Sequence, residues 1–245
     1  MNPFAFNRRV RAVIISYKSS KQFKNLLNDL KIDYIETIKC KDLDLPVDDH
    51  PDMVIHPVNY STFVVYNEHF DYYLDKTKKY NINIIKSKEK LNPKYPKDIL
   101  LNISRLNNYY FYKKDFIDEN LQYLLDKENT GITVNQGYAK CSSMIIKENT
   151  VITTDLKLHK IFLNLGLKSY LLNPNFIDLS GYNTGFIGGT CGNIGKDEVI
   201  FYGNLKKYKY YEELRKILER EKIDYYYPNV DTFIDRGSII GILGG

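Results

Sequence analysis

A thiol and an imidazole lie just before predicted strands, in segments far apart in the sequence. Cys141 follows Lys140 in GYAKC. A nearby cation lowers the pKa of a thiol, and the thiolate is the nucleophile of covalent catalysis, although strand alternation would turn Lys140 to the opposite face. His50, in DDHPD, could accept the thiol proton. Cys141 is thus a candidate nucleophile and His50 its candidate base. The alternative for Cys141 is a small buried side chain without chemistry.

Polar and charged residues lead into other predicted strands. Carboxylates can hold a planar cation such as guanidinium through paired hydrogen bonds. Three buried acids would repel one another unless a cation joined them. The candidate substrate-binding residues are Asp52, Asp98, Lys140, Asn183, Asp235 and Arg236. The alternative is an ion-pair network that ties these segments together without a ligand.

The elements that would position these side chains repeat along the chain. The clearest unit has strands at 142–147 and 151–155, an amphipathic helix at 156–166 and a strand at 167–173. Second strands of such units begin near positions that are 42 to 50 residues apart: Val13, Phe63, Tyr109, Val151 and Val199. This spacing is typical of repeat architectures.

The N-terminal unit lacks its first strand, and the C-terminal strand at 238–243 has no unit of its own. We therefore expect the last strand to complete the first unit and close a ring. The predicted fold class is α/β, a pseudo-fivefold ββαβ propeller in a single domain over residues 11–243. Its units are expected at 11–40 with 238–243, 52–90, 98–137, 141–178 and 184–230. The alternative is an open α/β sheet, which the predicted hairpins disfavour.

The glycine-rich stretch GGTCGNIG (residues 188–195) lies between two predicted strands. A phosphate loop would instead lead into a helix N-terminus, and the glycine spacing matches no nucleotide-binding motif. We expect the Gly188–Gly195 segment to form a long hairpin loop that could line or cover the central pocket. Cys191 is then expected to be exposed.

Composition excludes several classes of function. The net charge of +5 comes from lysines spread along all 245 residues, so no nucleic-acid partner is expected. No apolar run reaches the roughly 18 residues of a membrane span. The 3 cysteines suggest no disulfide framework and favour the cytoplasm. His50 and His56, with Asp49 and Asp52, match no familiar zinc spacing, so neither a metal nor another cofactor is expected.

The order of the units resembles the pentein fold, also called the guanidino-group modifying enzyme fold. The motifs DDHPDMVIHP, GYAKCS, GYNTGFIGGTCG and DRGSIIGI are similar to those of a bacterial branch of this fold. The resemblance spans about Arg11 to Leu243. It implies that active residues lie where the chain enters the first strand of each unit, near the axis. Its enzymes include arginine and agmatine deiminases, dimethylarginine hydrolases and amidinotransferases.

The resemblance implies a hydrolase or transferase that acts on a guanidinium or related amine compound. Asp52 resembles the acid that binds the guanidinium in these enzymes, and Asp98 the last residue of their Glu-Gly-Gly-Asp motif. Lys140 and Cys141 stand where the catalytic His is expected, and DRGSIIGI brings no Cys. Cys141 would thus be a displaced nucleophile. Translation initiation factor 6 has a similar fold and no catalytic site, so the alternative is a binding protein with a metabolite or protein partner.

Overall fold

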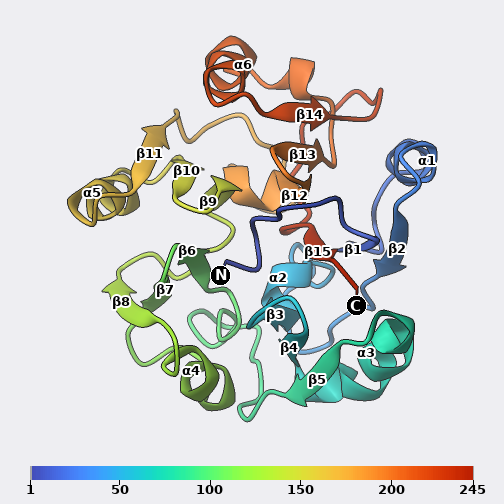
Figure 1. Ribbon diagram of the computed structural model, residues 1–245, viewed down its shortest axis with the longest axis vertical. Coiled ribbons are helices and arrows are strands. Elements are labelled where there is room, and N and C mark those ends of the chain that lie inside the picture. The colour runs from blue at the N-terminus through green and yellow to red at the C-terminus, as the bar shows by residue number, and fades with distance from the viewer. Residues whose placement is uncertain (1, 245) are drawn as a thin grey trace.

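Five small β-sheets surround a common centre in the computed structural model, which describes residues 2–244 (Figure 1). Each sheet has three strands. The middle strand pairs antiparallel with one neighbour and parallel with the other. A helix connects the two parallel strands, as a parallel pair requires a crossover. This is the expected ββαβ order.

The units follow one another around the centre. The first contains β1 (Ala12–Ile15), α1 (Lys21–Asp29), β2 (Asp33–Glu36) and β15 (Ile240–Ile242). The second contains α2 (Pro51–Val54), β3 (Ile55–Pro57), β4 (Thr62–Val65), η1 (Asn67–His69), α3 (Phe70–Thr77), η2 (Lys78–Tyr80) and β5 (Asn83–Lys86). The third contains β6 (Ser104–Leu106), β7 (Tyr109–Lys113), α4 (Glu119–Leu125) and β8 (Thr130–Val134). The fourth contains β9 (Ser143–Lys147), β10 (Thr150–Thr153), α5 (Leu156–Asn164) and β11 (Lys168–Leu171). The fifth contains η3 (Ile187–Thr190), β12 (Cys191–Gly195), β13 (Glu198–Phe201), η4 (Leu205–Lys207), α6 (Tyr211–Arg220) and β14 (Asp224–Tyr226).

The strand nearest the C-terminus joins the sheet of the N-terminal unit. β15 pairs antiparallel with β1, so that Ile242 lies opposite Ala12 and Ile240 opposite Ile14. All of these side chains are fully buried. Among residues 2–244 the strands form separate three-stranded sheets rather than one continuous barrel.

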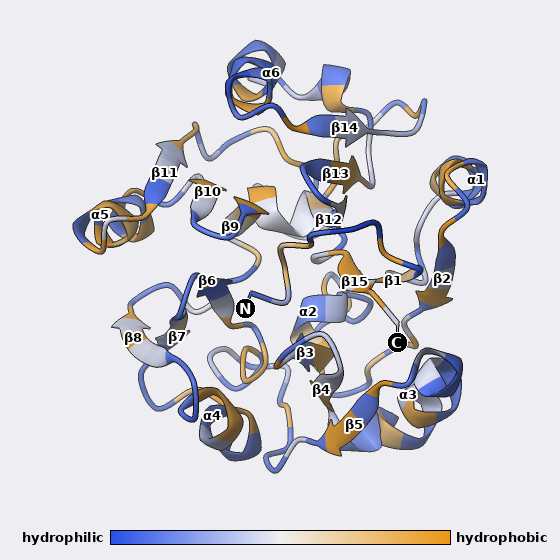
Figure 2. Ribbon diagram, viewed as in Figure 1, coloured by the Kyte–Doolittle hydropathy of each residue, from blue (hydrophilic) through white to orange (hydrophobic). Residues whose placement is uncertain are grey.

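The helices that connect parallel strands, α1 and α3 to α6, lie on the outside of the ring (Figure 1), whereas α2 lies near its centre. Figure 2 shows both hydrophobic and hydrophilic residues in α1, α5 and α6, which are amphipathic. α5 buries Leu158 and Phe162, which are four residues apart and therefore share one face. The side chain of Asp155 caps its first turn by accepting hydrogen bonds from the backbone N–H groups of Lys157 and Leu158. Within residues 2–244, no helix combines the length and the apolar character that a membrane span needs.

The inner strands begin later than the sequence predicts. The strand expected at 52–57 begins at Ile55, because Pro51 to Val54 form the helical turn α2. The strand expected to begin at Asp98 begins at Ser104, after a series of turns. Proline favours the first turn of a helix, and it stands at that position in α2. The segments that lead into the strands are therefore compact turns, which hold polar side chains near the axis.

The glycine-rich stretch is an inner strand, so the prediction of a hairpin loop over residues 188–195 is wrong. Gly188 to Thr190 belong to η3, and Cys191 to Gly195 form β12. A Cβ atom at Gly192 would clash with the carbonyl oxygen of Ile239, just before β15. The glycines thus allow neighbouring inner strands to approach closely. Cys191 is 3% exposed, which corrects the prediction that it is exposed.

The N-terminal segment lies across the centre of the ring (Figure 1). The side chain of Asn2 donates a hydrogen bond to the carbonyl of Arg105 in β6. The side chain of Asn193 in β12 donates to the carbonyl of Phe4. This segment therefore ties inner strands of different units together.

Candidate active site

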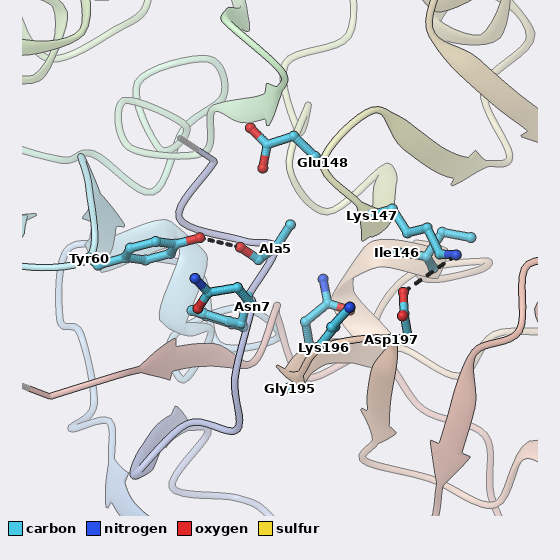
Figure 3. A pocket seen from close by; sticks show the side chains of 11 residues that line it. Ala5, Asn7, Tyr60, Ile146, Lys147, Glu148, Gly195, Lys196 and Asp197 are labelled. Atoms are coloured by element: carbon cyan, nitrogen blue, oxygen red, sulfur yellow. Dashed lines mark hydrogen bonds and ion pairs between the residues drawn. The ribbon is translucent and has the colours of Figure 1, made fainter.

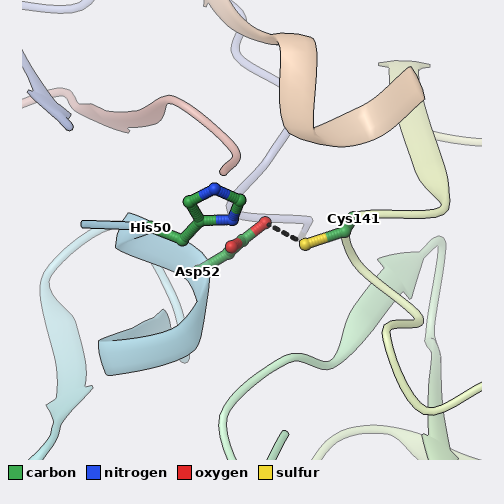
Figure 4. Close-up of side chains that lie close together, drawn as sticks. All are labelled: His50, Asp52 and Cys141. Atoms are coloured by element: carbon green, nitrogen blue, oxygen red, sulfur yellow. Dashed lines mark hydrogen bonds between the residues drawn. The ribbon is translucent and has the colours of Figure 1, made fainter. Parts of the chain in front are cut away.

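A buried cluster at the axis brings together three side chains from two distant segments. His50 precedes α2, Asp52 lies in its first turn, and Cys141 lies in the turn before β9 (Figure 4). Each is at most 2% exposed. One nitrogen, oxygen or sulfur atom of each lies within 4.8 Å of those of the other two. The structure thus brings the predicted nucleophile and base to one place with Asp52.

The carboxylate of Asp52 is the centre of this cluster. Its Oδ2 atom accepts hydrogen bonds from Cys141 Sγ at 3.1 Å, from the backbone N–H of Ser238 at 2.9 Å and from Ser238 Oγ at 2.5 Å. Its other oxygen, Oδ1, is buried and has no hydrogen-bond partner among the described residues. Asp52 therefore links the second, fourth and first units.

Asn102 fixes the turn that carries Cys141. Its side-chain oxygen accepts hydrogen bonds from the backbone N–H groups of Lys140 and Cys141, at 2.9 and 3.2 Å. Its amide nitrogen lies 3.1 Å from Cys141 Sγ. Burial, together with the negative charges of Asp52 and Asp235, raises the pKa of Cys141 well above its usual value. These contacts favour the neutral thiol over the thiolate, and the candidate role of Cys141 as nucleophile stays a prediction.

His50 has buried ring nitrogens without partners. Neither Nδ1 nor Nε2 makes a hydrogen bond within residues 2–244. Nδ1 lies 3.9 Å from Oδ1 of Asp235. The carboxylate of Asp235 accepts hydrogen bonds from the backbone N–H groups of Phe186 and Gly237, at 2.8 and 2.9 Å. Burial nevertheless raises the pKa of Asp235, because desolvation outweighs these contacts.

Lys140 reaches the cluster through a serine. Its Nζ atom donates to Ser238 Oγ at 2.7 Å and lies 4.9 Å from the centre of the Phe4 ring. It has no carboxylate partner within 4.0 Å among the described residues, and burial lowers its pKa. The substrate-binding role predicted for Lys140 would require its ammonium group to contact a ligand next to Ser238.

Three of the predicted substrate-binding residues lie outside the central cluster. Asp98 accepts a hydrogen bond from the hydroxyl of Tyr138 at 2.5 Å, and burial raises its pKa. Asn183 is exposed and lines a surface groove of about 770 Å³. Arg236 lies 4.0 Å from Asp49 and lines a cavity of about 100 Å³. The expected meeting of Asp52, Asp98 and Asp235 at the axis thus holds for two of the acids.

A second cavity lies along the N-terminal segment. It has a volume of about 570 Å³, and Figure 3 shows Glu148, Lys147 and Asp197 around it. Lys147 pairs with Asp197 across 3.4 Å. None of the residues that line this cavity belongs to the predicted site.

Sequence reasoning missed Ser238 and Asn102, which both touch the cluster. Each has a signal in the sequence. Asn102 is a polar residue inside the apolar run ILLNI, and Ser238 is the last polar residue of DRGS before an apolar run. A buried polar side chain needs partners, so both positions point to a polar centre.

Comparison with known proteins gives a family for this chain. A family model described as a family of unknown function, DUF6873, matches residues 14–240. No curated protein matches the sequence.

Solved structures of two amidinotransferases and of DDAH share this architecture. The amidinotransferase SxtG of Microseira wollei, from the saxitoxin biosynthetic pathway, matches with a TM-score of 0.59 at 12% identity, over 95% of this chain and 92% of that one. The inosamine-phosphate amidinotransferase StrB1 of Streptomyces griseus has a TM-score of 0.59 at 11% identity, over 99% and 96%. DDAH of Pseudomonas aeruginosa, solved with citrulline, has a TM-score of 0.55 at 9% identity, over 90% and 92%. At such identities the likeness shows the fold alone. The chain therefore belongs to the DUF6873 family and has the pentein fold.

Proposed function

We propose that the protein is a hydrolase or transferase acting on a guanidinium or related amine compound at the axis. The observation that carries this proposal is the convergence of Cys141, His50 and Asp52 within 4.8 Å. Asp235, which lies beside His50, adds a second buried carboxylate. Two carboxylates around a thiol suit a planar cation, which offers several N–H donors and an electrophilic carbon.

The proposed roles follow from the contacts. Asp52 and Asp235 hold the cation, and its charge offsets the two carboxylates that raise the pKa of Cys141. His50 accepts the thiol proton, and the sulfur attacks the central carbon to form an S–C bond. A C–N bond then breaks, and the departing amine takes the proton from His50. Water in a hydrolase, or an acceptor amine in a transferase, breaks the S–C bond and restores the thiol.

We test this function on protein that has been treated with a chelator to remove any bound metal ion. Arginine, agmatine and methylated arginines are each incubated with the chain, and amine release is measured together with the thermal transition. Iodoacetamide labelling of Cys141 is followed by peptide mass spectrometry. We expect one compound to raise the thermal transition, to protect Cys141 and to release an amine only when Cys141 is present. Cys191→Ser is the control, because Cys191 is also buried but makes no contact with Asp52. No protection, shift or product with any compound would refute the proposal.

A specific observation favours the alternative of a non-catalytic binding protein, with a metabolite or protein partner. The thiol of Cys141 is 2% exposed and has a raised pKa. If a guanidino compound stabilises the protein while Cys141 reacts with iodoacetamide only after unfolding, the site binds without covalent chemistry.

A further inference from the structure

The central cluster contains polar atoms that the protein itself does not satisfy. These are both ring nitrogens of His50 and Oδ1 of Asp52, and each has an accessible surface below 1 Å². Buried polar atoms are nearly always paired, so a group of unpaired ones at one point indicates an absent partner. Asp52 Oδ1 is an acceptor, and a neutral imidazole has one acceptor nitrogen and one N–H donor. The cluster therefore offers one unpaired oxygen and one unpaired nitrogen that can each bind a cation.

The donor set identifies the class of cation. A thiolate, an imidazole and a carboxylate are the three ligand types of zinc sites, whereas magnesium and calcium prefer oxygen alone. Zinc–ligand bonds of about 2.0 to 2.3 Å place neighbouring ligand atoms of a tetrahedral site roughly 3.5 Å apart. One donor atom of each of the three side chains lies within 4.8 Å of those of the other two, so a small movement would bring them to this spacing. We propose that His50, Asp52 and Cys141 bind one Zn²⁺ ion.

The surrounding contacts match those that orient zinc ligands. Asp235 lies 3.9 Å from Nδ1 of His50, which corresponds to a carboxylate behind a metal-bound histidine. Ser238 holds Oδ2 of Asp52 with its N–H and hydroxyl groups, so Oδ1 remains free for the metal. Asn102 contacts Cys141 Sγ at 3.1 Å. Ser238 and Asn102 therefore fix the directions of Asp52 and Cys141, and Asp235 stands beside the ring of His50.

Charge supports the same conclusion. The carboxylates of Asp52 and Asp235 place two negative charges in one buried space, and the thiolate that Cys141 would supply to a metal would add a third. Lys140 is close but hydrogen-bonds to Ser238 rather than to a carboxylate. A divalent cation would compensate most of this charge. Sequence spacing did not reveal the site, because Cys141 is 89 residues from Asp52 and joins it only in the folded chain.

This inference goes beyond the proposed function and does not rest on it. A zinc-bound thiolate is not free to attack carbon, so metal binding and covalent chemistry are alternative states of one cluster. Metal binding is therefore measured on the metal-loaded protein, and covalent chemistry is measured on the chelator-treated protein.

The experiment uses the full chain, purified without chelator and then titrated after chelator treatment. Elemental analysis is expected to give about one zinc per chain. Cobalt is expected to produce a thiolate-to-metal charge-transfer band and the visible bands of a four-coordinate ion. Cys141→Ser should abolish the charge-transfer band, and Cys191→Ser, the matched buried control, should retain it. Asp235→Asn should weaken zinc binding about 10- to 100-fold, the range for a residue behind a ligand.

If Cys141→Ser does not fold, X-ray absorption spectroscopy of the zinc-loaded wild-type chain tests the proposal without that variant. One sulfur and at least one imidazole in the first shell are expected. A folded wild-type chain that binds neither zinc nor cobalt would overturn the proposal. So would a zinc shell without sulfur, or loss of the cobalt band in Cys191→Ser.

Discussion

Replacing Ser238 by alanine tests how the buried lysine is accommodated. The hydroxyl accepts from Lys140 Nζ at 2.7 Å and lies 2.5 Å from Asp52 Oδ2. Without it, the nearest acceptor for Lys140 is the carbonyl of Ser143 at 3.5 Å. A single hydrogen bond to a charged group contributes about 1.5 to 3 kcal/mol, and the Ser238 hydroxyl makes one such bond with Lys140 and one with Asp52. We therefore expect Ser238→Ala to lower the free energy of unfolding by about 2 to 5 kcal/mol.

Equilibrium unfolding in guanidinium chloride with chelator present measures this loss. Lys140→Met removes the charge while keeping much of the side-chain volume, and it supplies the second arm of a double-mutant cycle. The double variant should be more stable than the sum of the single losses predicts, by about 1 to 3 kcal/mol. A Ser238→Ala loss below about 0.5 kcal/mol, the usual size of a neutral substitution, would contradict the reasoning. Additive losses would show that Lys140 and Ser238 are not coupled.

Three further predictions concern residues away from the cluster. Burial lowers the pKa of both His56 and His69, so the unfolded chain takes up their protons first as the pH falls. The contribution of the two neutral histidines to the free energy of unfolding should be complete above about pH 6.5, and it should decline below that pH by up to about 1.4 kcal/mol per pH unit for each histidine. Urea titrations from pH 7.5 to 5 measure this slope, and His56→Gln should reduce it. Gly192→Ala places a Cβ against Ile239 and should cost about 1 to 3 kcal/mol, seen by calorimetry as a fall in Tm, whereas an unchanged Tm would refute the close approach. Asp155→Ala removes the cap of α5 and should cost about 1 kcal/mol, measured by urea unfolding, and Asp155→Asn should recover most of the loss.

The sequence predicts the architecture well because each unit carries its own periodic signals. Apolar residues alternate along the middle strands and recur at helical spacing along the helices. One middle strand, β7, is expected from the residues YYFYKK and is found at Tyr109–Lys113. The inner strands are harder to predict, since they are short and buried on both faces. Glycine usually marks turns, so the glycines of β12 predict a loop, whereas in the structure they permit contact with residues before β15.

The site was predictable in part. Cys141, His50 and Asp52 are residues with strong chemistry in segments that lead into strands, and the structure places them together. Asp98 and Asn183 lie in similar segments, but both lie outside the central cluster. Side-chain direction in a turn does not follow the alternation of a strand, so the sequence does not show this difference. The roles of Asn102 and Ser238 depend on contacts across units, which no local pattern encodes.

The pairing of β15 with β1 has a consequence for synthesis on the ribosome. β1 is translated long before β15, and Ile14 finds its partner only when Ile240 has been translated. Until then β1 keeps an open edge that is available to a neighbouring nascent chain. Ser238, which anchors Asp52, is translated just before β15. Protection of the β1 edge from aggregation and assembly of the polar centre therefore depend on the same short stretch of chain.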